Sequence, residues 1–596
     1  MNAMMGHQNG SNKKTAGLIL LFSVVINALA FLEVICKTPP VWYTNDDYRM
    51  MTIVSGAYTG TPSADIVFMR YPIGWMLVCL YSLMPGIAWY GLFTMACMYI
   101  PSCIFCYYLI KKAYLKHMPL VGAVLYGLLF LLFIRKYICL PQFTLTSAFM
   151  GIGAIVIIHE MPPKKNIGHI MLAVFCCVVS FSVRSKAFYL LLPLLGLVAV
   201  LRLLNEKGTK LWKTFAVVGI VTALLCSTVA VVDYTVWNSS EEMRYFKRFT
   251  TARSQVYDYG GVPGYYEHRT FYLENDISEV SYRALSARYL DIDDHVDAET
   301  LERIAAYNEE LRTSKSIWSR LEDAVKETIE YWVDSGDEIV KYSAICVFIM
   351  LGVILVLAAK SLNIHLLFPA AVAGVLLETI YLKFSGRLVV RVLDMLLVAL
   401  GVVGCFAILD LLLPRTKSMR NYAAALRQNI SRAVGIGLVA LTVTAVAMAG
   451  FICQDTALKD KYRSATQTQN SRLDGLKAYA ALYPDSFFFY ESADFISCTD
   501  YVFVTYEEGQ ILNHDSLGSW NVCSPTYYRR NAAFHFTTAA DAFASTDTNV
   551  YFVSTSSPKM GITKTLKDRH NKKLRLVDTM ESDNYILYVY MVIDDD

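Results

Sequence analysis

Long apolar stretches recur along the first 452 residues and alternate with short polar segments. A hydrocarbon core of about 30 Å needs roughly 20 apolar residues in a helix, and eleven stretches approach that length. The pattern therefore predicts an α-helical polytopic membrane protein with about eleven transmembrane helices. The predicted spans cover residues 15–36, 89–110, 119–134, 142–158, 167–183, 187–204, 212–233, 339–359, 363–382, 387–412 and 433–452.

One further apolar segment, 72–86, closes at a Pro-Gly pair and is too short to span. We interpret it as an interfacial or re-entrant helix. With eleven spans and the N-terminus in the cytoplasm, the short inner loops are rich in Lys and Arg, as the positive-inside rule requires. This predicts a plasma-membrane protein with an extracytoplasmic C-terminal part. The inner loops are 111–117, 159–166, 202–213, 358–363 and 414–432.

The topology divides the chain into four parts. Residues 1–233 form an N-terminal membrane module, whose first outer loop is 37–88. Residues 234–338 form an extracytoplasmic helical loop, 339–452 the C-terminal transmembrane helices, and 453–596 a soluble extracytoplasmic α/β domain.

Both large outer parts carry recognisable periodicity. The middle part starts as coil and then shows apolar positions at helical spacing in 297–311 and 319–333, with Asp297 as an N-cap. The tail contains a short helix, four aromatic and β-branched runs that predict strands, and a second helix between strands. These segments are 473–482, 487–490, 549–554, 559–570, 574–579 and 585–592.

The composition agrees with a membrane protein. Of the 596 residues, 55% are hydrophobic and 18% are charged, against about 25% charged in a soluble domain. This excludes a disordered chain and disfavours an ordinary cytosolic enzyme. A net charge of +3 gives no sign of a nucleic-acid partner. The 14 cysteines lack metal-ligand spacing and lie mostly inside apolar runs, where they act as small hydrophobes.

Candidate chemistry begins in the first outer loop, which reads VWYTNDDYRM. Asp46 and Asp47 lie at the mouth of the bundle, beside Trp42, Tyr43 and Tyr48. Partial desolvation raises the pKa of such a carboxylate, which then suits it as a general base for a hydroxyl. The alternative is that the acidic pair solvates the loop or caps the following helix.

The order of elements around this loop resembles the GT-C class of membrane glycosyltransferases. A first helix, an acidic outer loop, a Pro-initiated interfacial helix and a Trp-Tyr pair before the second span are similar to aminoarabinose transferases, protein mannosyltransferases and oligosaccharyltransferases. The matching strings are TNDDY at 44–48 and YPIGW at 71–75, and the resemblance is clearest over 15–110. The second acidic residue is Asp rather than Glu, and a W-W-D string is missing, so the chain resembles a divergent member.

The resemblance implies transfer of a sugar from a polyprenyl-phosphate-linked donor to an extracytoplasmic acceptor, with inversion at the sugar. The acceptor is a cell-envelope glycan, a lipid or a protein. In that class the first acidic residue binds or deprotonates the acceptor or helps to hold a metal, which makes Asp46 the first catalytic candidate and Asp47 the second. A divalent metal stays an open alternative, because only some members require one.

Short outer loops should be poor in Lys and Arg, but three of them hold basic pairs. Arg binds phosphate oxygens through two parallel hydrogen bonds and Lys acts as a point charge, so these residues are candidates to hold a lipid phosphate. The alternative is that their side chains extend to lipid headgroups. The candidates are Arg70, Arg135, Lys136, Arg184, Lys186, Arg387 and Arg391.

Three charges share one face of the tenth span, because Arg387, Arg391 and Asp394 are spaced by four and three residues. A charge inside a membrane normally has a partner within the bundle. In a purely structural interpretation, Arg391 pairs with Asp394, and Glu378 of the preceding span is another possible partner. Arg387 would then remain free to bind a phosphate. The middle outer part adds Arg253, Asp258 and His268 as residues that would close over a site.

Other functions stay open at this stage. A flippase or transporter of a lipid-linked glycan would require inverted repeats and broken helices, which the sequence does not display. A scaffold or sensor would use the tail as a binding module, and a polymerase or ligase of envelope glycans would rely on a late basic outer loop. The transferase hypothesis requires Asp46, Arg184 and Arg387 to meet around one cavity.

Overall fold

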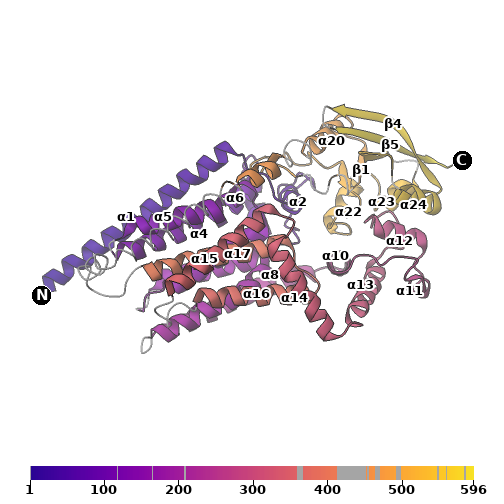
Figure 1. Ribbon diagram of the computed structural model, residues 1–596. Helices are drawn as coiled ribbons and strands as arrows, with labels where there is room; N and C mark the ends of the chain where they lie inside the picture. Colours follow the sequence, from indigo (N-terminus) through magenta and orange to yellow (C-terminus); the bar gives the residue numbers. More distant parts are fainter. Residues whose placement is uncertain are drawn as a thin grey trace.

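The computed structural model describes residues 2–412, apart from 117, 164–165, 207–209 and 359–366, and residues 452–595, apart from 453–454, 464–469, 492–494, 496–498, 546–548, 559 and 583–584. Most of this part is helical. A long helical bundle carries a mixed helix-and-strand region at one end, and the N-terminus lies at the other end (Figure 1).

Among the described residues, eight helices are long and apolar enough to cross a membrane, so the chain is a multi-pass membrane protein. The last predicted span, 433–452, lies outside the described residues except for its final position. The spanning helices are α1 (Asn2–Lys37, from Lys14), α4 (Trp89–Tyr114), α5 (Pro119–Leu129) with η1 (Phe130–Ile134) and α6 (Arg135–Cys139), α8 (Ile167–Asn205), α9 (Leu211–Trp237), α15 (Glu338–Ala358), α16 (Leu367–Phe384) and α17 (Val390–Leu412).

The fifth and sixth predicted spans are joined in α8, which is bent back on itself. Arg184 interrupts the helix with φ −154° and ψ 93°. Arg202, near the end of α8, donates from Nη2 to the carbonyl of Met161, which precedes the helix, at 3.0 Å. A straight helix would carry Arg202 about 50 Å from Ile167, too far for this contact. Two arms therefore meet at Arg184, as two separate predicted spans require.

Three shorter helices lie among or beside these spans. The predicted span 142–158 is α7 (Phe143–His159), which is buried from its first residue to Ile158 and is therefore shielded from lipid. The segment 72–86 forms the 13-residue α3 (Tyr71–Leu83), with a proline in its first turn. The first outer loop forms α2 (Asn45–Val54), which is buried from Asp47 onward.

The middle outer part, called here the outer cap, consists of five helices joined by turns and loops. Helix α13 is as predicted, and the Asp297 side chain accepts from the Thr300 amide at 2.8 Å as its N-cap. The expected coil start was wrong, because Ser240 caps a helix whose buried positions recur every three to four residues. The cap helices are α10 (Glu241–Tyr259), α11 (Arg269–Glu274), α12 (Glu279–Ser286), α13 (Ala298–Thr313) and α14 (Ile317–Val333).

The C-terminal domain is α/β, as predicted, with a five-stranded sheet in the order β2-β1-β3-β5-β4. Strand β1 pairs in parallel with β2 and β3, and the β3–β5 and β5–β4 pairs are antiparallel. The elements are α20 (Asn470–Leu482), β1 (Phe487–Tyr490), β2 (His514–Ser516), α22 (Pro525–Ala532), α23 (Ala539–Ala544), β3 (Val550–Ser554), α24 (Met560–His570), β4 (Lys572–Ser582) and β5 (Tyr585–Asp594).

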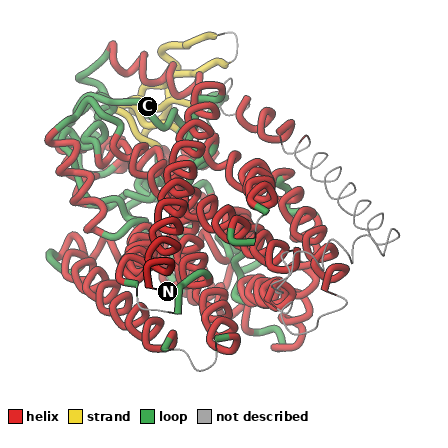
Figure 2. The backbone as a smooth tube through the Cα atoms, turned by 90° about the vertical axis from the view of Figure 1, so that its left-hand side faces the viewer, coloured by secondary structure: helices red, strands yellow, loops and turns green. Residues whose placement is uncertain are grey.

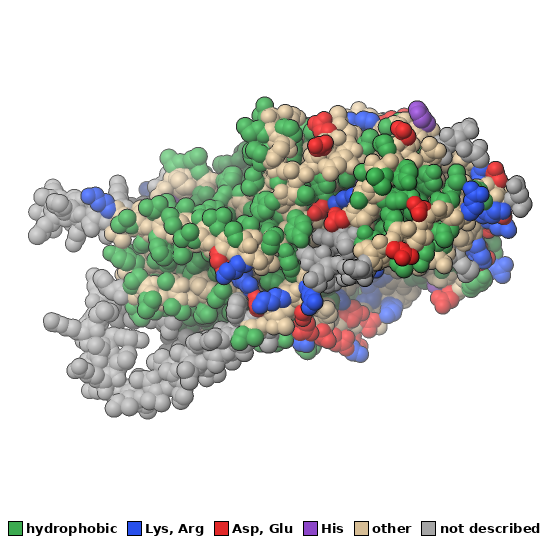
Figure 3. Space-filling view, turned by 90° about the horizontal axis from the view of Figure 1, so that it is seen from above, with side chains coloured by type: hydrophobic (Ala, Val, Ile, Leu, Met, Phe, Trp, Pro, Cys, Tyr) green, Lys and Arg blue, Asp and Glu red, His purple; other side chains and the backbone are tan. Residues whose placement is uncertain are grey.

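The surface separates the bundle from the outer parts. On the face shown in Figure 3, hydrophobic side chains cover most of the bundle, and charged side chains are more frequent toward the end of the molecule remote from the N-terminus. Viewed along the bundle, the strands lie to one side behind the helices (Figure 2). An apolar exterior over the bundle is what contact with lipid requires.

The C-terminal domain is attached to the first outer loop on both sides of α2. Before α2, the Trp42 amide donates to the Asp500 carbonyl at 3.1 Å. After α2, the Gly509 amide donates to the Gly56 carbonyl at 3.0 Å and the Ile511 amide donates to the Ala57 carbonyl at 3.1 Å. The position of α2 is therefore determined by parts of the chain that are more than 400 residues away in sequence.

Candidate functional site

A cavity of about 900 Å³ lies where the bundle, the outer cap and the C-terminal domain meet. Asp46 contributes to its wall from α2, and Arg184 and Lys186 from the bend of α8. Arg387 contributes from the loop before α17, and Arg391 from the first turn of that helix. Five of the nine site residues predicted from sequence thus surround one space, although they come from three distant parts of the chain.

Asp46 lies in the first turn of α2, where the helix dipole favours a negative charge. The capping interpretation is wrong, because Thr44 occupies the N-cap position and no side chain makes a cap hydrogen bond there. Within the described chain its carboxylate makes no recorded hydrogen bond or ion pair. Burial raises the pKa of Asp46 above its ordinary value, and Arg391, Arg253 and Arg184 act against this rise, in that order. Asp46 is thus a desolvated carboxylate close to three cations.

Asp47 differs from its neighbour, since it is fully buried and does not line the cavity. Its Oδ1 accepts hydrogen bonds from the Tyr90 hydroxyl at 2.9 Å and the Phe143 amide at 3.2 Å. Burial raises the pKa of Asp47 well above its usual range, against the effect of the Tyr90 hydrogen bond. This residue connects α2 to α4 and α7.

Arg184 reaches the cavity because the two arms of α8 end there. Its guanidinium carbon lies 5.3 Å from the Phe68 ring centre and 5.1 Å from that of Phe143, within the range of cation–π attraction. Neither Arg184 nor Lys186 forms an ion pair with any described carboxylate. Their charges are therefore available to a ligand in the cavity.

Arg387, just before α17, and Arg391, in its first turn, differ in their pairing. Arg387 forms an ion pair with Asp258 of α10 at 2.8 Å. The predicted ion pair between Arg391 and Asp394 is wrong, because Asp394 forms an ion pair with Lys136 instead, at 3.0 Å. Arg391 therefore lines the cavity without a recorded carboxylate partner in the described chain.

Three of the predicted phosphate ligands do not line the cavity. Arg70 pairs with Asp233 at the end of α9 at 2.5 Å, and Arg135 pairs with Asp455 at 2.6 Å. Lys136, besides its contact with Asp394, donates to the Ser343 hydroxyl at 2.6 Å. Their placement favours a role in joining helices.

The outer cap contributes three more cations to the cavity wall, Arg253, Arg288 and Arg312, and Arg312 is paired with Glu309. Arg253 lines the cavity with a buried Nε that lacks a hydrogen-bond partner. Burial lowers the pKa of Arg253, against the effect of Asp258 and Asp46. Arg288, which the sequence analysis missed, also lines the cavity and stacks on Tyr257 at 5.2 Å. Of the cap candidates, Asp258 also lines the cavity. His268, paired with Tyr307, and Glu378 of α16 do not.

The C-terminal domain forms one wall, which sequence reasoning did not identify. Trp520 packs edge-on against Phe68, with ring centres 5.0 Å apart. Gly518, at φ 70°, approaches the cap so closely that a Cβ there would lie 1.6 Å from the Arg288 carbonyl oxygen. Only glycine allows this approach. The side chains of this wall include Leu473, Tyr490, Phe495, Ser516, Ser519 and Trp520.

The donor set does not fit a divalent metal. In the part of the chain that the structure describes, no three His, Cys, Asp or Glu side chains gather in a way that could hold an ion. Beside Asp46, the carboxylate of Asp47 is already engaged by Tyr90 and Phe143. Metal-held chemistry at Asp46 therefore has no support in the residues present.

Comparison with known proteins gave structural matches only. No protein-family model matches the chain, and no curated protein matches it significantly. The chain is similar to ArnT from Cupriavidus metallidurans bound to undecaprenyl phosphate, with a TM-score of 0.46, 11% identity, and 96% of this chain and 97% of that chain covered. For the same protein in the apo state the TM-score is 0.42 at 11% identity, with 96% and 98% covered.

Proposed function

We propose that the protein is a membrane glycosyltransferase that transfers a sugar from a polyprenyl-phosphate-linked donor to an acceptor outside the cytoplasm. The acceptor is a cell-envelope glycan, a lipid or a protein. One observation carries the proposal: Asp46, a carboxylate with no ion pair among the described residues, lines the same cavity as Arg184 and Arg391 at the end of a membrane bundle. A base beside an anion-binding surface supplies both groups that displacement of a lipid phosphate needs.

The donor phosphate binds to the cations on the bundle side. Arg184 and Arg391 each offer two parallel donors to phosphate oxygens, and Lys186 adds a point charge. Arg387 contributes less, because Asp258 already pairs with it. These charges also stabilise the phosphate as it leaves, which lowers the barrier without any movement of the protein.

Asp46 acts as the general base. It takes the proton of an acceptor hydroxyl, whose oxygen attacks the anomeric carbon of the sugar from the side opposite the phosphate. The bond between the anomeric carbon and the phosphate oxygen breaks, the electron pair leaves with the phosphate, and the sugar configuration inverts. The raised pKa of Asp46 supports this role, since a base is most effective near the working pH.

The proposal places the cavity outside the cytoplasm of a cell with the N-terminus inside. Helix α4 supports this orientation. Its first residues lie at the cap end, where Tyr90 binds Asp47, and its last turn carries Lys111 and Lys112. Basic residues at the end remote from the cap are typical of a cytoplasmic side.

The test uses purified protein in lipid nanodiscs, a panel of undecaprenyl-phosphate-linked sugars, and an envelope extract as acceptor. The readout is released undecaprenyl phosphate. Asp46→Asn should lower the release rate by about 10²- to 10⁴-fold, the usual contribution of a general base. Asp65→Asn is the matched control, because Asp65 belongs to the same loop, binds Tyr71, and does not line the cavity.

Unchanged release by Asp46→Asn would remove this residue from the base role. Absence of release from every donor, together with absence of undecaprenyl phosphate binding by the wild-type protein, would remove the donor class. Movement of an intact lipid-linked sugar across the bilayer without cleavage would instead indicate a flippase.

A further inference from the structure

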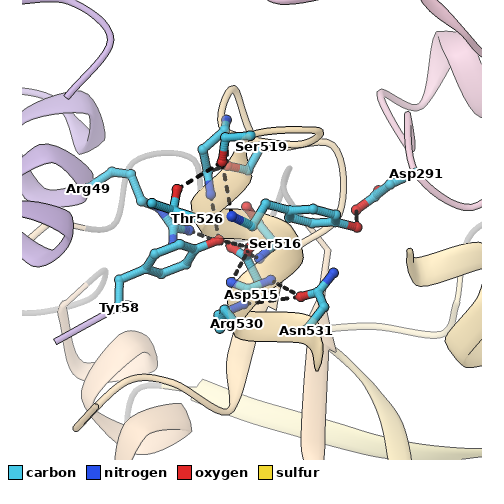
Figure 4. A network of polar contacts seen from close by, with 12 residues as sticks. Arg49, Tyr58, Asp291, Asp515, Ser516, Ser519, Thr526, Arg530 and Asn531 are labelled. Atoms are coloured by element: carbon cyan, nitrogen blue, oxygen red, sulfur yellow. Dashed lines mark hydrogen bonds and ion pairs between the residues drawn. The ribbon is translucent and has the colours of Figure 1, made fainter. Parts of the chain in front are cut away.

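A buried polar network joins α2 to the C-terminal domain (Figure 4). At its centre is Asp515 of β2, whose side chain is 1% exposed. Asp515 Oδ1 pairs with Arg49 Nη2 at 2.6 Å. Asp515 Oδ2 accepts from the Tyr58 hydroxyl at 2.6 Å and from Arg530 Nη1 at 2.5 Å. Both carboxylate oxygens are thus engaged, one of them by α2.

Aromatic packing adds to the network. The Tyr58 ring lies between two guanidinium groups, with Arg49 4.5 Å and Arg530 4.4 Å from its centre. Arg530 is itself buried and binds Asn531 Oδ1 at 2.8 Å. The side chains come from α2, the turn after it, β2 and α22. The first outer loop and the C-terminal domain therefore share one charged core.

The charge of this core depends on Asp515. Burial acts to raise the pKa of Asp515, but Arg49 and Arg530 outweigh it and hold the pKa at about 2. The carboxylate is therefore ionised at neutral pH and offsets one of two buried cations. Without it, both guanidinium groups would be buried with no counter-charge, a strongly unfavourable state.

The network lies one turn from the candidate base. Arg49 follows Asp46 by three residues, so both side chains lie on the same face of α2, and both line the cavity. The flanking backbone hydrogen bonds fix the two ends of α2, and the Arg49–Asp515 pair fixes its rotation. Displacement of a catalytic group by about 1 Å can cost roughly 10²-fold in rate.

We propose that Asp515 is a positioning residue for Asp46. It acts through Arg49 and sets the direction in which the carboxylate of α2 faces the cavity, so the C-terminal domain is an integral part of the active site. This inference rests on the proposed function for its kinetic consequence, but its structural consequence can be measured separately.

The experiment compares Asp515→Asn with Asp293→Asn as the matched control. Asp293 is also buried and pairs with Arg569 of the C-terminal domain at 3.2 Å, but it belongs to the outer cap and does not touch α2. We expect Asp515→Asn to lower kcat by about 10- to 100-fold. Undecaprenyl phosphate binding should change by less than about threefold, because Arg184 and Arg391 stay in place. Asp515→Glu, which restores the charge, should recover part of the rate, and Asp293→Asn should keep kcat.

Two further measurements separate positioning from general stability. In the Asp46→Asn background, Asp515→Asn should lower the residual rate by less than about twofold, because its effect passes through Asp46. Hydrogen exchange of residues 45–54 should accelerate in Asp515→Asn and not in Asp293→Asn, whether or not any transfer is detected. If Asp515→Asn does not fold, Tyr58→Phe removes one hydrogen bond to Asp515 and should give smaller changes in the same direction.

Equal kcat and equal exchange of residues 45–54 in the Asp515 and Asp293 variants would overturn the inference. A wild-type protein that releases undecaprenyl phosphate from no donor would overturn the proposed function, while the exchange data would still decide whether Asp515 orders α2.

Discussion

Two groups of basic side chains lie near the cap end of the bundle and differ in what they face. Arg70, Arg135 and Lys136 each bind a carboxylate from another helix. Arg184 and Arg391 line the cavity and have no recorded ion pair within the described chain. Both groups lie at helix ends or, for Arg184, at a helix bend. The presence of an acidic partner, rather than the residue type, separates a contact between helices from a cation that lines the cavity.

The largest expected effect comes from removing the charges of the cavity group. Arg184→Ala combined with Arg391→Ala should weaken undecaprenyl phosphate binding by about 100-fold or more, because a hydrogen bond to a charged group contributes about 1.5–3 kcal/mol. Binding in nanodiscs measures the effect. Arg135→Ala, which removes a cation that already pairs with a carboxylate, should change undecaprenyl phosphate binding by less than about threefold. An equal loss of binding in both variants would show that the two groups of basic side chains do not differ in function.

The paired group should show the opposite profile. Lys136→Met leaves Asp394 buried without a counter-charge, which should destabilise the protein by about 3–5 kcal/mol. The second substitution Asp394→Leu should restore much of the lost stability. Thermal unfolding in detergent measures both, and donor binding per folded molecule should be unchanged. Reduced donor binding by folded Lys136→Met would instead indicate that this lysine contributes to the donor site.

Acid sensitivity extends the comparison to carboxylates. Asp515 is paired, and its pKa is held at about 2, below the ordinary value of 3.8. Its contribution to stability is therefore complete above about pH 4 and is lost as the pH falls through 2. A shift of this size corresponds to about 2 kcal/mol. Acid unfolding of the wild-type protein should show this loss, and Asp515→Asn should show a shallower slope over the same window.

The smallest effect concerns Asp46, which has no ion pair among the described residues and whose pKa is raised by burial. Because the base must be deprotonated, kcat/KM should fall as the pH drops through this raised pKa. Arg253 lowers the pKa of Asp46, so Arg253→Gln should move the acid limb of the profile to higher pH. A shift to lower pH, or an acid limb that persists in Asp46→Asn, would assign the limb to another group.

Much of the architecture could be predicted from the sequence because it depends on local pattern. Runs of apolar residues located the helices, including the two arms of α8. The 13-residue α3 was recognised as too short to span. Four strands of the sheet followed from aromatic and β-branched runs. Strand β2 was missed because it has three polar residues and no apolar signal.

The candidate site was predictable only in part. Asp46, Arg184 and Arg391 were found because charges are conspicuous in an apolar sequence. Sequence could not separate them from Arg70, Arg135 and Lys136, since the deciding partners are 163, 320 and 258 residues away. The wall that contains Trp520 carried no motif, and its role depends on the docking of a whole domain.

The pair between Arg49 and Asp515 also bears on biogenesis. The two residues are 466 positions apart, so a ribosome that has delivered α2 to the membrane must continue for roughly half a minute to a minute and a half before the partner emerges, at about 5–20 residues per second. During that interval the nascent chain holds an incomplete form of the proposed site. Premature termination upstream of residue 515 should therefore yield a membrane-inserted but inactive protein. The proposed sugar transfer would begin only once the C-terminal domain has docked.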